Sequence, residues 1–323
     1  MDNTPLLSVI VPCYNAAHLI IEYLNQISES ANLDLVEFII VDDCSKDDSF
    51  TLLKEYASHV PCRIVIGTTK TNSGPGTARN IAINLSRGKY MTFLDADDRL
   101  TAEFYEKFND FLSEEIDLVV FDYDIVNGDN KRRGFQFFCT NHNASDIEEV
   151  VAFIAGGPWG KIYKSDIIKN HKITYLDQKR GEDIPFTKVA CSYCKTFLYI
   201  NEPFYEYIQS ESSIMHDSKL IDPQNGINAF DYIKKRLNKE IDPSVLDAIY
   251  IKQFLYGGSI TYIKTMDKSQ WKSYVSGLLE DHPGLLKNKY FHRFSNTTRF
   301  LVWLIYRKKY ALIKMILYVC GRY

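Results

Sequence analysis

The sequence has no apolar run long enough to cross a membrane, and we expect no leader of the secretory type. Its first apolar stretch, 6–11, is far shorter than the roughly 18 residues of a spanning helix, and no basic segment precedes it. An excess of positive charge is also missing, because 38 Lys and Arg stand against 41 Asp and Glu. The charge balance therefore indicates no attraction to nucleic acid. Because no secretory leader is expected, we expect a protein that begins in the cytoplasm.

Cysteine is sparse and irregularly spaced. The seven cysteines show no repeating interval, and an odd number cannot all pair within one chain, so a reducing compartment is expected. Only Cys191 and Cys194 lie close together, and no second Cys or His pair completes a zinc site with them. We interpret both as core thiols in a helix.

The rest of the composition is that of a globular protein. Of the 323 residues, 46% are hydrophobic and 24% are charged, and the chain has only 16 Gly and 10 Pro. These proportions exclude collagen-like, coiled-coil and disordered classes. At roughly 150 residues per domain, the length predicts about two domains or one large one.

Four short apolar runs near the N-terminus predict strands that are buried on both faces. They alternate with segments of helical spacing, which is the pattern of an α/β fold with a parallel sheet. The predicted strands are 7–11, 36–41, 63–67 and 90–94, and the predicted helices are 18–32, 49–58 and 77–85.

Beyond residue 100 the pattern is more mixed. It predicts a helix over 104–114, a strand over 117–123, a polar turn over 127–133, two helices with a Gly-rich connection within 147–197, and a charged loop around 180–183. After Ser212 the pattern becomes helical.

The tail, residues 291–323, combines aromatic and basic residues. It holds seven Lys or Arg and no acid, and Arg307, Lys308 and Lys309 separate two apolar clusters. These charges interrupt any spanning helix. Two alternatives stay open: a basic, aromatic helix on an anionic membrane surface, and a helix packed on the protein with a solvated basic face.

Carboxylates follow two of the predicted strands. Asp95, Asp97 and Asp98 come directly after the fourth strand, and Asp42 and Asp43 end the second. Ligands of open parallel sheets bind beyond the carboxyl ends of the strands, where these acids would lie. Clustered hard oxygens suit Mg²⁺ or Mn²⁺ that also holds substrate phosphates. Taken alone, each group is more often a cap of the following turn.

Four motifs, in order, resemble the family 2 glycosyltransferases of GT-A fold. They are SVIVPCYN at 8–15, FIIVDDCSKD at 38–47, NSGPGTARN at 72–80 and FLDADD at 93–98. Two later segments, WGKIY at 159–163 and GEDIPF at 181–186, are similar to the acceptor-side motifs of that family. The resemblance covers roughly the first 215 residues.

The resemblance implies a fold and a division of the chain. The fold would be a Rossmann-like mixed sheet flanked by helices, with a helical C-terminal extension. Residues 1–215 would form the catalytic domain, with a nucleotide-sugar-binding half over 1–105 and an acceptor-binding half over 106–215. Residues 216–323 would form the helical region that ends in the basic tail.

The resemblance also implies site residues. Those that bind the nucleotide sugar would be Pro12, Tyr14, Asn15, Asp43, Arg79, Asp95 and Ala96. Asp43 would hydrogen-bond the base, usually uracil, and Arg79 would face the nucleotide or its phosphates. Asp97 would be the principal protein ligand of Mn²⁺ or Mg²⁺. Cys44 stands where the family usually has Gly, which removes no functional group.

On the acceptor side, Asp183 beside Glu182 would be the general base. The alternative for this pair is a helix N-terminus, where the dipole favours acids. Trp159 would stack on a sugar or fill core space. Lys161 would pair with a phosphate or with Glu182, unless it is a solvated lysine. His216 is a further metal candidate, with a surface histidine as its alternative.

Together the motifs indicate an inverting, metal-dependent glycosyltransferase. It would move a hexose or N-acetylhexosamine from a nucleotide sugar, with UDP expected, to a saccharide hydroxyl. The basic tail suggests a lipid-linked acceptor at the cytoplasmic membrane face, in bacterial surface polysaccharide or lipopolysaccharide synthesis. A non-catalytic nucleotide-sugar-binding relative stays open, as does a phosphotransferase with Asp95 as nucleophile, which Arg99 disfavours because such sites usually have Thr or Val there.

Overall fold

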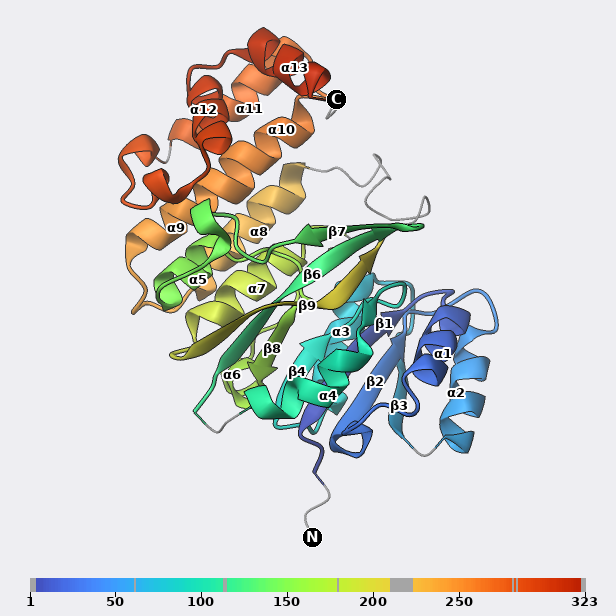
Figure 1. The fold of residues 1–323 in the computed structure, drawn as a ribbon. Coiled ribbons are helices and arrows are strands. Elements are labelled where there is room, and N and C mark those ends of the chain that lie inside the picture. The colour runs from blue at the N-terminus through green and yellow to red at the C-terminus, as the bar shows by residue number, and fades with distance from the viewer. Residues whose placement is uncertain are drawn as a thin grey trace. The chain divides into compact units, whose positions relative to one another are not determined.

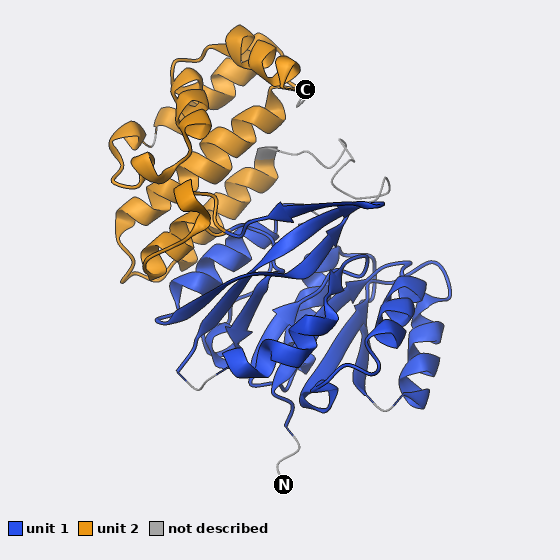
Figure 2. Cartoon of the chain, viewed as in Figure 1, with its two compact units in different colours: residues 1–136, 155–221 blue, residues 137–154, 222–323 orange. Residues whose placement is uncertain are grey.

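The structure is a computed structural model that describes residues 4–60, 62–112, 115–178, 180–209, 223–280, 282 and 284–320. Figure 1 shows its helices and strands. The chain divides into two compact units. Unit 1 comprises residues 1–136 and 155–221, and unit 2 comprises residues 137–154 and 222–323 (Figure 2).

Unit 1 is built on one mixed sheet. Its strands are β1 (Leu7–Cys13), β2 (Val36–Asp42), β3 (Arg63–Thr68), β4 (Tyr90–Phe93), β5 (Arg99–Leu100), β6 (Leu118–Asn127), β7 (Asn130–Gly134), β8 (Lys161–Lys164) and β9 (Phe197–Ile208). The order is β3-β2-β1-β4-β8-β6-β9-β5, with β7 paired to β6. The first four strands are parallel, and β8 runs antiparallel to both β4 and β6. The α/β class and the four N-terminal strands are confirmed.

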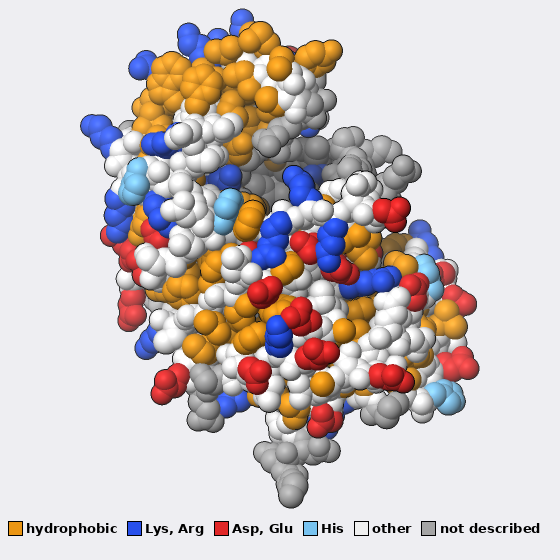
Figure 3. All heavy atoms as spheres, in the orientation of Figure 1, with side chains coloured by type: hydrophobic (Ala, Val, Ile, Leu, Met, Phe, Trp, Pro, Cys, Tyr) orange, Lys and Arg blue, Asp and Glu red, His pale blue; other side chains and the backbone are white. Residues whose placement is uncertain are grey.

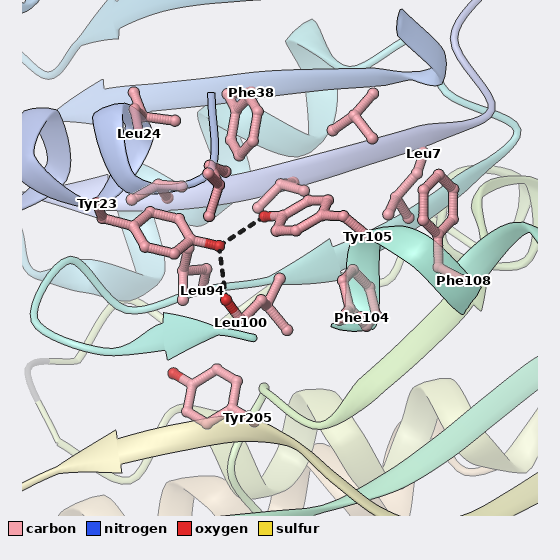
Figure 4. Close-up of a cluster of buried hydrophobic side chains, with 14 of the residues drawn as sticks. Leu7, Tyr23, Leu24, Phe38, Leu94, Leu100, Phe104, Tyr105, Phe108 and Tyr205 are labelled. Atoms are coloured by element: carbon pink, nitrogen blue, oxygen red, sulfur yellow. Dashed lines mark hydrogen bonds between the residues drawn. The ribbon is translucent and has the colours of Figure 1, made fainter. Parts of the chain in front are cut away.

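Helices cover both faces of this sheet. They are α1 (Ala17–Gln26), α2 (Ser49–His59), α3 (Pro75–Leu85), α4 (Ala102–Phe111), α6 (Ser165–Asn170) and α7 (Asp183–Ser192). Alternate residues of β1 face the core shared with α1 and α4, where Tyr105 contacts Tyr23 Oη at 2.7 Å and Tyr23 donates to the carbonyl of Leu100 at 3.2 Å (Figure 4). On the other face, Phe93 meets Phe186 of α7 edge-on. The parallel strands are therefore covered by packed helices on both faces.

Local signals explain several helix ends. The Thr101 side chain accepts a hydrogen bond from Phe104 N and starts α4. Pro75 begins α3 directly after Gly74, whose φ of 92° requires a residue without a side chain. The helix predicted over 18–32 ends early, at Gln26, and a 3₁₀ turn at Leu33–Leu35 leads into β2 instead.

The prediction of a polar turn over 127–133 is wrong. β6 extends to Asn127, and most of the segment forms β7, which pairs with β6 in a hairpin. The charged residues of this segment suggested a solvated turn. Instead they form ion pairs across the hairpin, between Lys131 and Asp124 at 3.1 Å and between Arg133 and Asp122 at 3.2 Å. The prediction from the sequence also missed β8, which is only four residues long and directly follows the Gly-rich segment 156–160.

The close cysteine pair is buried and unpaired, as expected. Cys191 lies in α7 and Cys194 just beyond it, and both are free thiols. Burial raises the pKa of the Cys191 thiol to about 11, which makes it an inert core residue at neutral pH.

Unit 2 is helical. It contains α5 (Ile147–Phe153), α8 (Pro223–Arg236), α9 (Pro243–Ile249), a π-helical segment (Tyr250–Gly258), α10 (Ser259–Tyr262), α11 (Lys268–Glu280), α12 (Asn296–Tyr306) and α13 (Tyr310–Val319). In the part of the chain that the structure describes, no helix has the length and hydropathy to cross a membrane. The division predicted between 215 and 216 falls outside the described residues, and the two functional halves of residues 1–215 stay a prediction.

Candidate active site

A buried arginine gathers three carboxylates at the carboxyl ends of the parallel strands. Arg79, on α3, places Nη2 2.6 Å from Asp95 Oδ1, directly after β4. Its Nη1 lies 2.9 Å from Asp183 Oδ1 and 3.2 Å from Glu182 Oε1, at the start of α7. The arginine side chain is only 4% exposed. Arg79, from the motif at 72–80, thus pairs with acids of the motifs at 93–98 and 181–186.

The acids at the start of α7 are held by close packing as well as by charge. Gly76, in the first turn of α3, permits the approach, because a Cβ there would lie 2.9 Å from Glu182 Cγ. Glu182 is the N-cap residue of α7 and Asp183 is its first residue. The helix dipole therefore adds to the stabilisation of both carboxylates by Arg79.

Asp183 combines partial exposure with an altered acidity. Burial, and then the charge of Glu182, raise the pKa of the Asp183 carboxyl well above its usual range, while Arg79 opposes this shift. The Asp183 side chain nevertheless keeps 31% of its surface open. A reachable carboxylate with a raised pKa is a stronger base than an ordinary aspartate.

The three acids after β4 differ in their surroundings. Asp98 is buried and accepts hydrogen bonds from Tyr205 Oη at 2.6 Å and from Ile208 N at 2.8 Å, so it fixes the end of β9. Asp95 carries the ion pair with Arg79. Asp97 lies at the surface, but partial desolvation of its carboxyl, followed by the charge of Asp95, raises the pKa of that carboxyl. Asp95 and Asp97 therefore form a like-charge pair at the edge of the site.

The acids after β2 order two loops. Asp42 accepts from Ser45 N at 3.1 Å and caps the turn in which Cys44 has a left-handed φ of 57°. That conformation favours Gly, which accounts for the residue usual in the family at this position. Asp43 accepts from Ser73 N at 3.0 Å and from Gly74 N at 2.7 Å, and so it holds the Gly-rich loop before α3. Its predicted contact with a base stays a prediction.

The loops after β1 and β2 are linked to each other. Asn15 N donates to Ser45 Oγ at 2.8 Å, and Asn15 Oδ1 accepts from Lys46 N at 2.8 Å. Pro12 is buried within β1, whereas Tyr14 is 38% exposed. Ala96 packs against the core of the sheet. Of the residues proposed to line a base, Tyr14 is thus the one with an open ring.

Trp159 belongs to an aromatic stack next to the acids. Its ring lies parallel to Tyr205 with 5.0 Å between centroids and to Tyr207 with 5.9 Å, and it meets Tyr123 edge-on at 4.6 Å. Because Tyr205 also donates to Asp98, the stack connects Trp159 to the acidic loop. Trp159 is half-buried, so part of the ring stays open.

The environment of Lys161 differs from what the sequence led us to expect. It is fully buried, and Nζ donates to Gln136 Oε1 at 2.8 Å, to Gly157 O at 2.9 Å and to Trp159 O at 3.0 Å. It is therefore neither solvated nor paired with Glu182. All three N–H groups are used inside the protein, so Lys161 fixes the turn that carries Trp159 and has no donor left for an acceptor.

Replacing Lys161 with Met should destabilise the protein in a pH-dependent way. Three buried acceptors would lose a donor, at a cost of about 1–3 kcal/mol. Burial lowers the pKa of Lys161 from 10.5 to about 7, so above that pH the unfolded wild type binds a proton that the folded protein has released. Wild-type stability therefore rises with pH there, and the variant lacks this rise.

Urea unfolding at about pH 6.5 and about pH 9 measures the effect, and the difference between wild type and variant should be larger at the higher pH. Lys70→Met, at an exposed position, is the control and should change little. An equal difference at both pH values would contradict the lowered pKa.

Comparison with known proteins assigns the family. Residues 8–207, more than half of the chain, match the model described as Glycosyl transferase family 2. The chain belongs to glycosyltransferase family 2. The resemblance drawn from the sequence motifs is confirmed, and the matched segment contains every residue of the Arg79 cluster.

Two curated relatives are named as glycosyltransferases of poly(ribitol-phosphate). The poly(ribitol-phosphate) beta-glucosyltransferase of Bacillus spizizenii is 26% identical over 289 residues, which cover 86% of this chain and 45% of that protein. The poly(ribitol-phosphate) beta-N-acetylglucosaminyltransferase TarS of Staphylococcus aureus is 25% identical over 292 residues, covering 85% and 49%. This chain thus spans about half the length of these relatives.

Solved structures of two other proteins share the fold. The structure of S. aureus TarS 1-349 in complex with UDP-GlcNAc matches with a TM-score of 0.75 at 21% identity, covering 98% of this chain and 92% of that one. A mannosyltransferase from Pyrobaculum calidifontis in complex with GDP-Man and Mn²⁺ matches with a TM-score of 0.55 at 15% identity, covering 100% and 89%. The expected GT-A fold with a helical C-terminal extension is confirmed.

The acids after β4 fit a divalent ion of the kind expected in this family. Within the described ranges, no group of three or more His, Cys, Asp or Glu forms a closed metal cage. Mg²⁺ and Mn²⁺ need no such cage when substrate phosphates complete the shell. Asp97 and the second oxygen of Asp95 offer hard donors, and their mutual repulsion would be relieved by a cation. His216 lies outside the described residues.

Sequence reasoning missed two tyrosines of the site. Tyr205 hydrogen-bonds Asp98 and stacks on Trp159. Tyr175 stacks on Phe186 with 3.9 Å between centroids, and the Arg79 guanidinium lies 5.3 Å from its ring. The alternation of aromatic residues at 205 and 207 was a signal for a strand with one aromatic face. No motif marks Tyr175.

Proposed function

We propose that this protein is an inverting glycosyltransferase that moves a hexose or N-acetylhexosamine from a UDP-sugar to a bacterial cell-wall polysaccharide of the teichoic acid type. The observation that carries the proposal is the convergence of Asp95, Glu182 and Asp183 on Arg79 at the ligand-binding edge of a GT-A sheet. The printed activities of the relatives support the polymer class, and the UDP-GlcNAc complex of TarS supports the nucleotide. The reaction would take place in the cytoplasm.

Asp183 would act as the base. Its carboxylate would take the proton of the acceptor hydroxyl while that oxygen bonds to C1 of the sugar and the bond from C1 to the diphosphate breaks. The base and the leaving group lie on opposite sides of C1 in such a displacement, so the configuration inverts. Arg79 would hold the Asp183 carboxylate in place through the 2.9 Å ion pair.

The donor would bind along the loops after β1, β2 and β4. Tyr14 offers an exposed ring for the base, with Pro12 and Asn15 beside it, and Asp43 orders the Gly-rich loop. Asp95 and Asp97 would hold Mn²⁺ or Mg²⁺. That ion, when bound, supplies positive charge to the departing diphosphate.

The phosphotransferase alternative fits the site poorly. Attack by Asp95 on a phosphoryl group would use one carboxylate of the cluster and leave Glu182 and Asp183 without a role. The transferase mechanism makes Asp183 the base and so accounts for more of the site.

Calorimetric titration tests the nucleotide and metal assignments together. The protein should bind UDP in the presence of Mn²⁺, bind it far more weakly with excess chelator, and bind GDP weakly under either condition. Asp97→Ala should lower Mn²⁺-dependent UDP affinity about 10-fold or more, the range in which loss of a metal-ordering group falls. Asp110→Ala, an exposed acid on α4, is the matched control. Unchanged UDP affinity in Asp97→Ala would remove Asp97 as a ligand, and no binding of either nucleotide would overturn the proposed function.

A further inference from the structure

The exposed face of α13 is apolar. Ile313 and Leu317 are buried against unit 2, whereas Met315, Tyr318 and Val319 are 57%, 75% and 78% exposed. With Leu312 these exposed residues recur at helical spacing, so they form one stripe along the helix. A helix at the solvent-exposed surface of a protein normally carries polar residues on its outer side.

The adjoining helix continues this surface with aromatic rings. On α12, Phe300 and Trp303 are 51% and 44% exposed, and their rings lie nearly parallel with 6.4 Å between centroids. The two rings border an open hollow of about 500 Å³. Figure 3 shows hydrophobic side chains gathered over α12 and α13, with Lys and Arg at the margin.

The segment that carries the two helices is basic and has no acid. Residues 291–323 contain no Asp or Glu, and Arg299, Arg307, Lys308 and Lys309 form no ion pair with any carboxylate in the described part of the chain. The Arg307 guanidinium lies 6.0 Å from the Trp303 ring, so cationic and aromatic groups are interleaved. Strong positive charge beside exposed Trp, Tyr and Met is the composition of a helix at a membrane interface.

We propose that α12 and α13 form a docking surface for an anionic phospholipid bilayer. The apolar stripe of α13 and the rings of Phe300 and Trp303 would enter the boundary of headgroups and acyl chains, and the basic residues would pair with lipid phosphates. A second copy of this chain fits the surface less well. A self-complementary contact would bring the basic residues of this segment in the two copies together, and the segment itself offers no acid to neutralise them.

The proposal does not depend on the transferase reaction, although it would bring the enzyme to acceptors made at a membrane. Flotation of the full chain with vesicles tests it directly. Vesicles of phosphatidylcholine alone and of phosphatidylcholine mixed with phosphatidylglycerol are compared at low and high salt. The protein should float with the anionic vesicles at low salt, and high salt should weaken this binding.

Two variants separate the charged and apolar contributions. Arg307→Gln with Lys309→Gln should weaken binding to anionic vesicles roughly 25-fold, at about fivefold for each basic residue. Met315→Ser with Tyr318→Ser should weaken it about 10-fold or more. Ile227→Ser, at a 48% exposed position on α8, is the matched control and should bind like wild type. Thermal unfolding checks that each variant is folded.

Tryptophan emission gives a second readout at the proposed surface. Trp271 is buried and Trp159 is half-buried, so a blue shift on addition of anionic vesicles should come from Trp303 and disappear in Trp303→Phe. Equal binding to both vesicle types, or wild-type flotation of both double variants, would overturn the proposal. So would a dimer that the Met315 and Tyr318 changes dissociate, together with no flotation, because a second copy would then be the partner.

Discussion

Replacing Asp183 with Asn is expected to lower kcat about 10²- to 10⁴-fold while leaving UDP affinity within about twofold of wild type. The amide keeps the size of the side chain and one oxygen for Arg79, but it has no carboxylate to accept the proton of the attacking hydroxyl. The nucleotide would bind through the loops after β1, β2 and β4, which this change leaves in place. A turnover assay with a UDP-sugar and a polyol-phosphate acceptor measures the first effect, and calorimetry measures the second.

Asp166 provides a matched control for this experiment. It also lies in the first turn of a helix, α6, but it is exposed and outside the Arg79 cluster. Asp166→Asn should keep full activity. If Asp183→Asn also kept full activity, Asp183 would not be the base, and if it lost UDP binding as well, its role would be structural.

The pH profile gives a second test of the base. Because burial and the Glu182 charge raise the pKa of Asp183, wild-type activity should fall as the pH drops through that raised value, where the base becomes protonated. Glu182→Gln removes the neighbouring charge and should shift the acid limb of the profile to lower pH. An acid limb that stays in place in Glu182→Gln would show that the limb reports another group.

The sequence was sufficient to place the motifs at one edge of the sheet. Parallel strands end on the same side, so acids after β2 and β4 had to meet there. The sequence did not predict that Arg79 would form an ion pair with Asp183, 104 positions away. That contact depends on the packing of α3 against the start of α7, including the close approach at Gly76, and no spacing along the chain encodes it.

The errors share a physical cause. Lys161 and the strands of the β6–β7 hairpin carry charges, and charge in a sequence suggests solvent. Lys161 is buried because Gln136 and two carbonyl oxygens satisfy its three donors, and the hairpin charges pair across strands. In both cases, partners within the folded protein satisfy the charge, and the composition of a segment does not show them.

Replacing Arg79 with Ala is expected to lower the free energy of unfolding by about 3–5 kcal/mol near neutral pH. The change removes the cation from Asp95, Glu182 and Asp183 and leaves three close carboxylates facing one another. Arg99 is the control, because its ion pair with Glu22 lies at the surface, with side chains 34% and 57% exposed. Arg99→Ala should cost at most about 1 kcal/mol.

The Arg79 effect should depend on pH in a defined direction. Without the guanidinium, the folded-state pKa of Asp183 rises further above its unfolded value, so the folded variant binds more protons than the unfolded chain. Its stability must then fall as the pH rises from about 4 through that raised pKa. The difference in free energy of unfolding between wild type and Arg79→Ala should therefore be smaller at about pH 5 than at about pH 8 in urea unfolding.

Arg79→Lys should recover part of the loss in stability, because one ammonium restores the charge but not the two-pronged contact to Asp95 and Asp183. A loss as small as that of Arg99→Ala, or one that does not change with pH, would mean that the three acids are not held together by the arginine charge.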